Sequence, residues 1–413
     1  MPSNRREFGA RLAMGGAAAL WSRPLPALDS ASDDVSSWKG VRAQFLFPQE
    51  TVLMNAANLC PASRPVLESL YSNADLDHDM SPANRDRMHK GREATRQLLA
   101  EFLRVTPEEV MITRNTSEGN NLVSSGLDLK AGDEVLVFSD NHPSNLQAWN
   151  EKAKRFGFSV RLVQQVNPHP GAARYLEAFE AQMSPRTRLL ALTHMTNTVG
   201  DVLPVSDLCR LARQRGVLSL VDGAQSFGLM DVDLSQIQPD FYSGSGHKWL
   251  CGPKETGVLY VRKEVQARLW PSVISAYTGE VGLSRRHEGM GQRDDCAIIA
   301  LGEALKLQTR VGRQRIDARS RQLAGMLIEG LNKIPGVKVW THPEAGRSHS
   351  VVSFQPGSQA PREFASRLYD KAKIVTATRG GQDRPGVRLA PHFYNLDEDV
   401  ERTLAKVRQL MAG

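Results

Sequence analysis

Along the middle of the chain, from about residue 88 to 262, short apolar runs alternate with stretches in which apolar residues recur at helical spacing. Short, mostly apolar runs that are typical of buried strands occupy Val110–Thr113, Glu134–Phe138, Ser159–Val163, Thr187–Thr193 and Val217–Val221. Helical spacing of apolar residues separates these runs, at Lys90–Leu103, from Glu118 onward, at Pro143–Phe156 and at Val205–Gln214. Strands that alternate with helices predict a mostly parallel sheet covered on both faces.

The pattern changes after about residue 290. Two long helices are predicted first, and shorter strands and helices follow them, at Asp294–Thr309, Arg313–Lys333, Val337–Trp340, Val351–Phe354, Pro361–Lys371, 374–376, 387–390 and Leu396–Leu410. This mixture predicts a smaller α+β domain. We therefore expect an N-terminal signal over 1–27, a polar surface segment over 28–55, a large domain over 56–290 and a small domain over 291–413.

The first residues have the order of an export signal. Arg5-Arg6 and Phe8 precede a short apolar run from Leu12 to Trp21, and Pro26-Ala27 follows as a cleavage site. Adjacent arginines before such a run resemble a twin-arginine (Tat) signal, which carries folded proteins across the bacterial inner membrane. The sequence therefore predicts a periplasmic protein that uses the Tat machinery.

Composition is that of an ordinary globular protein, with 41% hydrophobic and 23% charged residues among 413. The formal charge of +7 invites a nucleic-acid interpretation, but cleavage after Ala27 would leave only +4. No run rich in Lys and Arg with interleaved aromatic residues follows, so nucleic acid is not an expected partner. No apolar run approaches the ~18 residues that a membrane span needs, so stable membrane insertion is not expected either.

The cysteines are Cys60, Cys209, Cys251 and Cys296. None belongs to a CxxC pair, so the sequence predicts neither a zinc site nor a redox motif. An oxidising compartment would permit disulfides. The wide, irregular spacing gives no pairing, and four free thiols are the prediction.

Three motifs carry candidate chemistry. Asp222 ends a predicted strand in SLVDGAQSFG, at the edge where ligands bind open parallel sheets. Lys248 follows small residues in SGSGHKWLCGP and precedes apolar Trp249, so its amine is expected to be desolvated and nucleophilic. Thr116 and Ser117 open a helix, where hydroxyls and free N–H groups suit a phosphate, although they could also be a plain helix cap.

A phosphate cradle, an Asp at a strand end and a desolvated Lys together describe a pyridoxal phosphate (PLP) site. VDGAQSFG, SGSGHKWLCGP and RLAPHFYNLDEDV together resemble the class V aminotransferase family, from about Asn55 to the C-terminus. That family has the aspartate-aminotransferase-like fold type I, and it includes isopenicillin N epimerase-like proteins, cysteine desulfurases and kynureninases. The resemblance implies a large domain with a mostly parallel seven-stranded sheet, a small C-terminal α+β domain, and a homodimer with sites at the subunit interface.

The same resemblance assigns roles by motif. It implies that Lys248 forms the Schiff base with the cofactor, that Asp222 pairs with the pyridine nitrogen, and that Gln225 bonds the ring hydroxyl. His142, in SDNHPSNLQAW, matches the aromatic residue that stacks on the ring and is the third expected catalytic residue beside Lys248 and Asp222. Asn197, in HMTNTVGDVLPV, falls beside the ring and the substrate.

Phosphate ligands follow by the same comparison. Thr116, Ser117, Ser245 and His247 match positions that bind the cofactor phosphate. Arg388, in GVRLAPHFYN, matches the arginine that grips the substrate carboxylate, and a bidentate guanidinium suits that task.

The chain departs from the family pattern in two places. Gln292 in EGMGQRDD replaces a threonine that reaches the partner subunit's phosphate in relatives, although Gln could still donate a hydrogen bond. The desulfurases with a mobile catalytic cysteine carry it in the C-terminal domain, but no cysteine follows Cys296 here. Cys60 lies in the N-terminal segment that approaches the active site in relatives and could touch the substrate, but a packed thiol is the prediction. We expect the substrate pocket to be shaped by loops near Tyr277, Arg285-Arg286 and Arg379.

The resemblance implies an enzyme that acts at the α-carbon of an amino acid or of an amino-acid end of a larger molecule. Transamination is the first expectation. Epimerisation, a C–S lyase or desulfurase-like β-elimination, and tailoring of a siderophore (pyoverdine) side chain stay open. A catalytically silent PLP-fold binding protein is the non-enzyme alternative, and the intact Lys248, Asp222 and Arg388 argue against it. A nicotinamide dehydrogenase would need a GxGxxG loop, which the sequence lacks.

Overall fold

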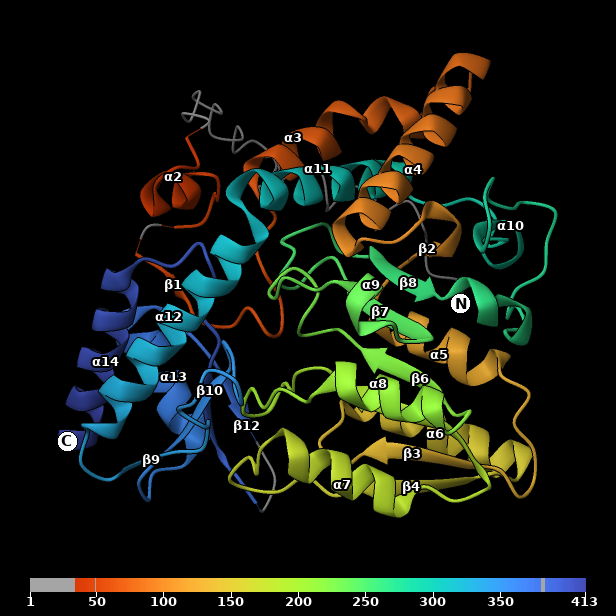
Figure 1. Cartoon of the computed structure of the whole chain (residues 1–413). Coiled ribbons are helices and arrows are strands. Elements are labelled where there is room, and N and C mark those ends of the chain that lie inside the picture. The colour runs from red at the N-terminus through yellow and green to blue at the C-terminus, as the bar shows by residue number, and fades with distance from the viewer. Residues whose placement is uncertain (1–33, 49, 380–382) are drawn as a thin grey trace, which may run out of the picture. The chain divides into compact units, whose positions relative to one another are not determined.

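The computed structural model describes residues 34–48, 50–379 and 383–413 (Figure 1). The expected signal over 1–27 lies outside these residues, and the Tat and periplasmic assignments stay predictions. No helix of the described residues is long and apolar enough to cross a bilayer.

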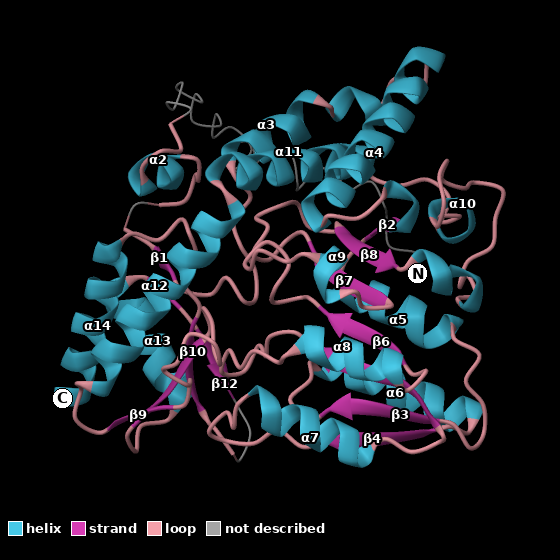
Figure 2. Ribbon diagram, viewed as in Figure 1, coloured by secondary structure: helices cyan, strands magenta, loops and turns pink. Residues whose placement is uncertain are grey.

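A seven-stranded sheet forms the centre of the large domain (Figure 2). Its strands are β2 (Val110–Thr113), β3 (Glu134–Phe138), β4 (Ser159–Val163), β5 (Thr187–Thr193), β6 (Leu218–Asp222), β7 (Phe241–Ser245) and β8 (Gly257–Val261). They lie in the order β2-β8-β7-β6-β5-β3-β4. Every neighbouring pair from β7 to β4 is parallel, and β8 runs antiparallel to both β7 and β2. The predicted α/β class and mostly parallel sheet are confirmed.

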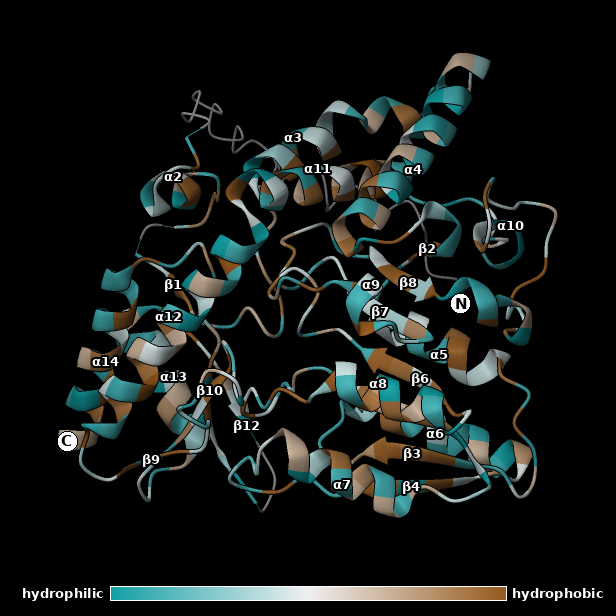
Figure 3. Ribbon diagram, viewed as in Figure 1, coloured by the Kyte–Doolittle hydropathy of each residue, from teal (hydrophilic) through white to brown (hydrophobic). Residues whose placement is uncertain are grey.

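Both faces of this sheet are buried because alternate side chains of each strand point to opposite sides. In β3, Leu136 and Phe138 belong to one hydrophobic cluster, and Val135 and Val137 belong to the other. The central strands are accordingly mostly apolar, as the brown colour of β3 and β6 shows in Figure 3, whereas edge strand β4 is partly exposed.

Helices cover each face. Those that supply side chains to the first cluster are α3 (Arg64–Ser72), α4 (Pro82–Leu103), α7 (Ala172–Gln182), α8 (Val205–Gln214) and α11 (Asp295–Val311). The second cluster takes side chains from α5 (Thr116–Gly126) and α6 (Pro143–Phe156). Two one-turn helices, α9 (Leu234–Ile237) and α10 (Ser284–His287), lie in connections. The sequence had not predicted α3 or α7.

The small domain is built on an antiparallel sheet in the order β12-β13-β10-β9. Its elements are α12 (Arg313–Asn332), β9 (Val337–Val339), β10 (Val352–Pro356), α13 (Pro361–Ala372), β12 (Ala377–Arg379), β13 (Gly386–Leu389) and α14 (Asp397–Ala412). Apolar residues of α12, α13 and α14 cover this sheet in a separate hydrophobic cluster. The predicted small α+β domain is confirmed, and β12 is a strand that the sequence had not predicted.

The N-terminal segment is more structured than its polar composition predicts. It forms α2 (Trp38–Ala43), whose Val41 is fully buried, and β1 (Val52–Leu53), which pairs in parallel with β11 (Ile374–Val375). Val52 and Met54 join the core of the small domain. A segment that precedes the large domain in sequence therefore contributes to the small domain in space.

The transition between the domains follows α11. Apolar side chains of α11 pack in the core of the large sheet, whereas those of α12 pack in the core of the small sheet. The connection at Gly312, between these two helices, is where the chain passes from one core to the other. The expected boundary at residue 290 therefore lies one helix before this change of core.

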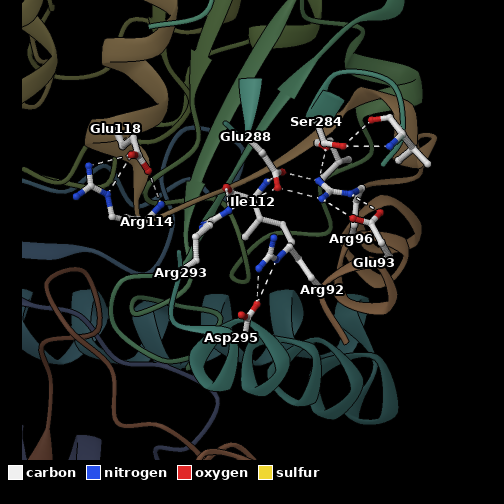
Figure 4. A network of polar contacts seen from close by, with 12 residues as sticks. Arg92, Glu93, Arg96, Ile112, Arg114, Glu118, Ser284, Glu288, Arg293 and Asp295 are labelled. Carbon is white, nitrogen blue, oxygen red and sulfur yellow. Dashed lines mark hydrogen bonds and ion pairs between the residues drawn. The ribbon is translucent and has the colours of Figure 1, made fainter. Parts of the chain in front are cut away.

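A buried polar network supports the edge strand β2 (Figure 4). Arg96 of α4 donates to both oxygens of Glu288, at 2.5 and 3.0 Å, and neither side chain is more than 1% exposed. Oε1 of Glu288 also accepts the backbone N–H of Ile112 at 2.7 Å, and Arg293 donates to the carbonyl of Ile112 at 2.9 Å. Charged side chains thus bind both the backbone N–H and the carbonyl of Ile112, near the end of β2.

Replacement of Glu288 by Gln is expected to lower the free energy of unfolding by about 3 kcal/mol, because it leaves the guanidinium of Arg96 buried without its main counter-charge. Urea unfolding followed by intrinsic fluorescence measures the change. Glu151→Gln is the matched control, because it removes an exposed pair with Lys154 and should cost less than about 0.5 kcal/mol. Equal losses in the two variants would contradict the role of the network.

Candidate active site

A cavity of about 240 Å³ opens beyond the carboxyl ends of β6 and β7. This is the edge at which open parallel sheets bind ligands. The residues that line it are Asn58, Asn115, Thr116, Ser117, Asn120, His142, Ser144, Asn145, Asp222, Ala224, Ser245, His247 and Lys248. Seven side chains expected at the cofactor thus meet in one place: Thr116, Ser117, His142, Asp222, Ser245, His247 and Lys248.

Asp222, the last residue of β6, is held by two donors. Nδ2 of Asn120 donates to its Oδ2 at 2.8 Å, and the backbone N–H of Ala224 donates to its Oδ1 at 3.0 Å. The hydroxyl of Ser243 donates to Oδ1 of Asn120 at 2.6 Å, which fixes the orientation of that amide. The carboxylate is 5% exposed, so the bonds that it receives inside the protein determine where it points.

Sequence reasoning missed Asn120. The residue lies four positions after Thr116 on α5, so both side chains share one helix face and reach the same cavity. A polar residue one helical turn after Thr116 was the available signal. Asn58 was missed because its segment is far in sequence from the other cavity residues, and Asn145 was missed although it follows His142 by three residues in the same motif.

Lys248 lies in the turn after β7. Burial lowers the pKa of its amine, the negative charge of Asp222 opposes that shift, and the positive charge of Arg388 adds to it. The turn is fixed by the next residue, because the carbonyl of Trp249 accepts from Gln308 of α11 at 2.7 Å and from Nε2 of His392 at 2.5 Å. A reactive neutral amine is thereby available at a lower pH than for an ordinary lysine.

The N-terminus of α5 forms the expected anion cradle. The backbone N–H of Thr116 donates to Oγ of Ser245 at 2.9 Å, and the two hydroxyls lie 2.8 Å apart. Asn115 caps the helix by accepting from the N–H of Glu118 at 3.0 Å. Hydroxyls and helix-terminal N–H groups beside each other are suited to a phosphate. Burial and the charge of Lys248 lower the pKa of His247 to about 4, so this ring is neutral at pH 7.

His142 is the N-cap residue of α6. Its Nδ1 accepts the backbone N–H of Ser144 at 3.3 Å, which leaves a neutral ring with its proton on Nε2. Burial and the nearby Lys248 lower its pKa, which favours the same neutral form. The ring lies at the cavity as expected, and stacking on a cofactor stays a prediction.

Gln225 and Asn197 do not line the cavity itself. Nε2 of Gln225 donates to the carbonyl of Ala57 at 3.0 Å, and its Oε1 accepts from the indole of Trp249 at 2.8 Å. These bonds fix the amide and leave one N–H of Nε2 for a further acceptor. Asn197 contributes its carbonyl, which accepts from Arg388. Direct contact of either side chain with the cofactor stays a prediction.

Arg388 of β13 is buried, with 8% of its surface exposed. Its Nη1 donates to the carbonyl of Asn197 at 2.8 Å, and its Nη2 donates to Oδ1 of Asn55 at 3.0 Å. Burial, and then the charge of Arg379, lower its pKa to about 10. Among the described residues no carboxylate lies within 4.0 Å of it, so the guanidinium is held in place and still lacks a counter-ion.

Gln292 lies away from this cavity. It lines two surface depressions, one with Tyr277 and the other with Val273. The segment that carries those two residues also exposes Trp270 and Ile274, at 62% and 83%. Contiguous exposed apolar side chains are typical of an interaction surface, whereas isolated ones are common. The predicted homodimer, and any contact of Gln292 with the partner subunit's phosphate, stay predictions.

The four cysteines are buried free thiols, as expected. Cys60, Cys251 and His392 lie close enough to hold a metal, with candidate ligand atoms within 4.8 Å of one another. Both ring nitrogens of His392 already have partners, at the carbonyl of Trp249 and, more weakly at 3.5 Å, at the hydroxyl of Ser320. We therefore describe the cluster as packing, in line with the interpretation of Cys60 as a packed thiol.

The family model for class V aminotransferases matches residues 61–402. The chain belongs to this family. Isopenicillin N epimerase of Amycolatopsis lactamdurans is 30% identical over 394 residues, which span 91% of this chain and 99% of that protein. A probable cysteine desulfurase of Methanothermobacter thermautotrophicus is 28% identical over 401 residues, 90% of this chain and 98% of that protein.

Solved structures agree with the fold. The apo cysteine desulfurase of Thermococcus onnurineus NA1 superposes with a TM-score of 0.82 at 25% identity, covering 91% of this chain and 98% of that one. A lysine-to-alanine mutant of C-DES, with glycine covalently linked to its PLP cofactor, has a TM-score of 0.81 at 26% identity and covers 89% and 98%. These structures confirm fold type I.

The cofactor of this class V enzyme is pyridoxal 5′-phosphate. The residues present fit that group. Asn145 lines the cavity with a buried amide whose two polar atoms have no partner among the described residues. The α5 terminus suits the phosphate, Lys248 the aldehyde, and Asp222 the ring nitrogen.

Substitution of Asn120 by Ala is expected to weaken PLP binding about tenfold, because Asp222 loses the bond that orients it and bonds to charged groups contribute about 1.5–3 kcal/mol. Fluorescence titration of the apoenzyme with PLP measures the affinity. Asn150→Ala on the exposed side of α6 is the control and should leave the affinity unchanged. Unchanged affinity in the Asn120 variant would show that Asp222 holds its position unaided.

Proposed function

We propose that this enzyme removes and returns the α-proton of an amino acid, or of an amino-acid end of a larger molecule, and that epimerisation is its reaction. One observation carries the α-proton chemistry: Lys248, with its lowered pKa, lines the same cavity as the buried Asp222. An isolated surface lysine would be protonated at neutral pH and could not act as a base.

Each residue has a task in that chemistry. PLP, when bound, supplies an electron sink at the α-carbon. Arg388 binds the substrate carboxylate through donors that Asn55 and Asn197 hold in place. Asp222 would keep the ring nitrogen of the bound cofactor protonated, and Lys248 would accept the proton of the α-carbon. Epimerisation then requires that a proton return to the opposite face of that carbon. Asn55 forms a bridge with Ala390 of the small domain, and Asn58 lines the cavity, so this N-terminal segment borders the site.

Epimerisation is preferred to the other branches on two grounds. Isopenicillin N epimerases match this chain over more than nine-tenths of its length. The cysteine desulfurases match it comparably, but residues 297–413 contain no cysteine, so no thiol of the small domain can take up sulfur. None of the relatives reported above is named as a transaminase. Transamination, the first expectation from the sequence, is therefore one of the outcomes that the test below distinguishes.

The test follows α-proton exchange in D₂O. Lys248→Ala is expected to lower the rate of Cα–H exchange about 10²–10⁴-fold, the range that a positioned general base contributes. Proton NMR measures the exchange, and chiral chromatography identifies the product. Lys263→Ala, an exposed lysine outside the cavity, is the control and should keep the rate of the unmodified enzyme.

The products separate the branches. A D-amino acid supports epimerisation. A keto acid with pyridoxamine phosphate would overturn epimerisation in favour of transamination and leave the α-proton chemistry intact. If no amino acid exchanges its α-proton, and Lys248→Ala equals the unmodified enzyme, the whole proposal fails.

We also propose that residues 1–27 direct export by the twin-arginine route. The support is the order of Arg5-Arg6, a short apolar run and Pro26-Ala27 in the sequence. A protein that binds its cofactor before export suits a route that carries folded passengers. Mature periplasmic protein should begin near Leu28 by N-terminal sequencing. Arg5→Lys with Arg6→Lys should retain the precursor in the cytoplasm, and unchanged export of that variant contradicts the proposal.

A further inference from the structure

Two arginines lie side by side on one face of the small sheet. In the antiparallel pair of β12 and β13, Ala377 is opposite Arg388, and Arg379 is opposite Gly386. Side chains two positions apart on a strand share a face, so Arg379 and Arg388 are diagonal neighbours on the same face. Such neighbours are about 7–8 Å apart, within reach of long side chains. Ala377 and Gly386, the direct partners, are too small to separate them.

Neither arginine has a counter-ion. Among the described residues no Asp or Glu lies within 4.0 Å of Arg379 or Arg388. Nε of each is buried and has no hydrogen-bond partner. The two charges also act on each other, since the charge of Arg379 contributes to the lowered pKa of Arg388. Arg388 is buried and Arg379 is half-buried, and like charges in such neighbouring positions are costly unless an anion joins them.

The acidic groups nearest to this pair are already used. Asp140, whose charge reaches Arg379, pairs with Arg384 at 3.0 Å and accepts the hydroxyl of Thr198. Asp201 lies 3.9 Å from the other end of Arg384, and burial raises its pKa to about 7. These two carboxyl groups therefore pair with Arg384, and the guanidinium groups of Arg379 and Arg388 stay available to an anionic ligand.

We propose that Arg379 and Arg388 together select a dicarboxylic amino acid, with the α-carboxylate on Arg388 and the side-chain carboxylate on Arg379. This inference rests on the proposed function, because it places the α-carbon next to Lys248. The α-carboxylate reaches Arg388 between its bonds to Asn55 and Asn197. A side chain that leads away from the α-carbon along the sheet then meets Arg379 on the adjoining strand.

The experiment compares isosteric ligands on the holoenzyme. L-glutamate and L-glutamine differ in one charge and have nearly the same shape, and the absorbance change of the bound cofactor reports the binding of either. The unmodified enzyme is expected to bind glutamate at least about tenfold more tightly than glutamine. Arg379→Gln should remove most of that preference by weakening glutamate about 10–100-fold and glutamine less than about threefold.

Two further variants complete the design. Arg379→Lys keeps the positive charge but lacks the planar guanidinium that can bind a carboxylate through two hydrogen bonds. This variant should keep part of the preference for glutamate that Arg379→Gln loses. Arg362→Gln, which removes an exposed arginine on α13, is the matched control and should leave both affinities unchanged. Circular dichroism of each variant checks that the fold is retained.

Several results would overturn the inference. Equal affinity of the unmodified enzyme for glutamate and glutamine is one, and equal weakening of both ligands by Arg379→Gln is another. If no amino acid perturbs the cofactor, the proposed function fails separately. The inference is then decided by the melting temperature of the holoenzyme. Glutarate should raise it more than butyrate does, because glutarate carries two carboxylates. Neither acid reacts with the cofactor, so this measurement does not depend on the proposed function. Equal stabilisation by the two acids would overturn the inference.

Discussion

The structure depends on one buried carboxylate at the end of its central strand. Asp222 is nearly inaccessible to water, and a charge in that position requires donors or a cation. Asn120 and Ala224 supply the donors, and Ser243 fixes the first of them. The arrangement needs α5 to pack against β6 and β7 in one register. A change in that packing would move the carboxylate, the helix terminus and the lysine turn relative to one another.

The small domain completes the site from the other side. Its Arg388 and His392 reach the large domain, and the carbonyl of Trp249 accepts from His392 and from Gln308 of α11 at once. The N-terminal segment adds a third connection, because Asn55 accepts from Arg388 and Ala57 accepts from Gln225. The groups proposed to bind the substrate and to transfer the proton therefore come from separate domains, which these hydrogen bonds hold together.

Local signals predicted most of the large domain. The runs at Glu134–Phe138 and Thr187–Thr193 are strands with the predicted bounds, because burial on both faces leaves a mostly apolar run in each. Strand β12 was missed since its pattern is short and mixed. Helix α2 was missed because one buried residue, Val41, is too weak a periodic signal. The polar Asn120 was missed because its partner, Asp222, is 102 positions away in sequence.

By itself the sequence determined the fold class and the cofactor and predicted the main residues of the site, because an acidic strand end, a glycine-rich turn and the lysine that follows it are local features of the chain. Only the tertiary structure decided how those residues are held. Asn120 donates a hydrogen bond to Asp222, and Gln225 hydrogen-bonds both Ala57 and Trp249. Gln292 does not line the cofactor cavity. The pairing of Arg379 with Arg388 is of the same kind, since strand register, which no local pattern encodes, puts the two charges on one face.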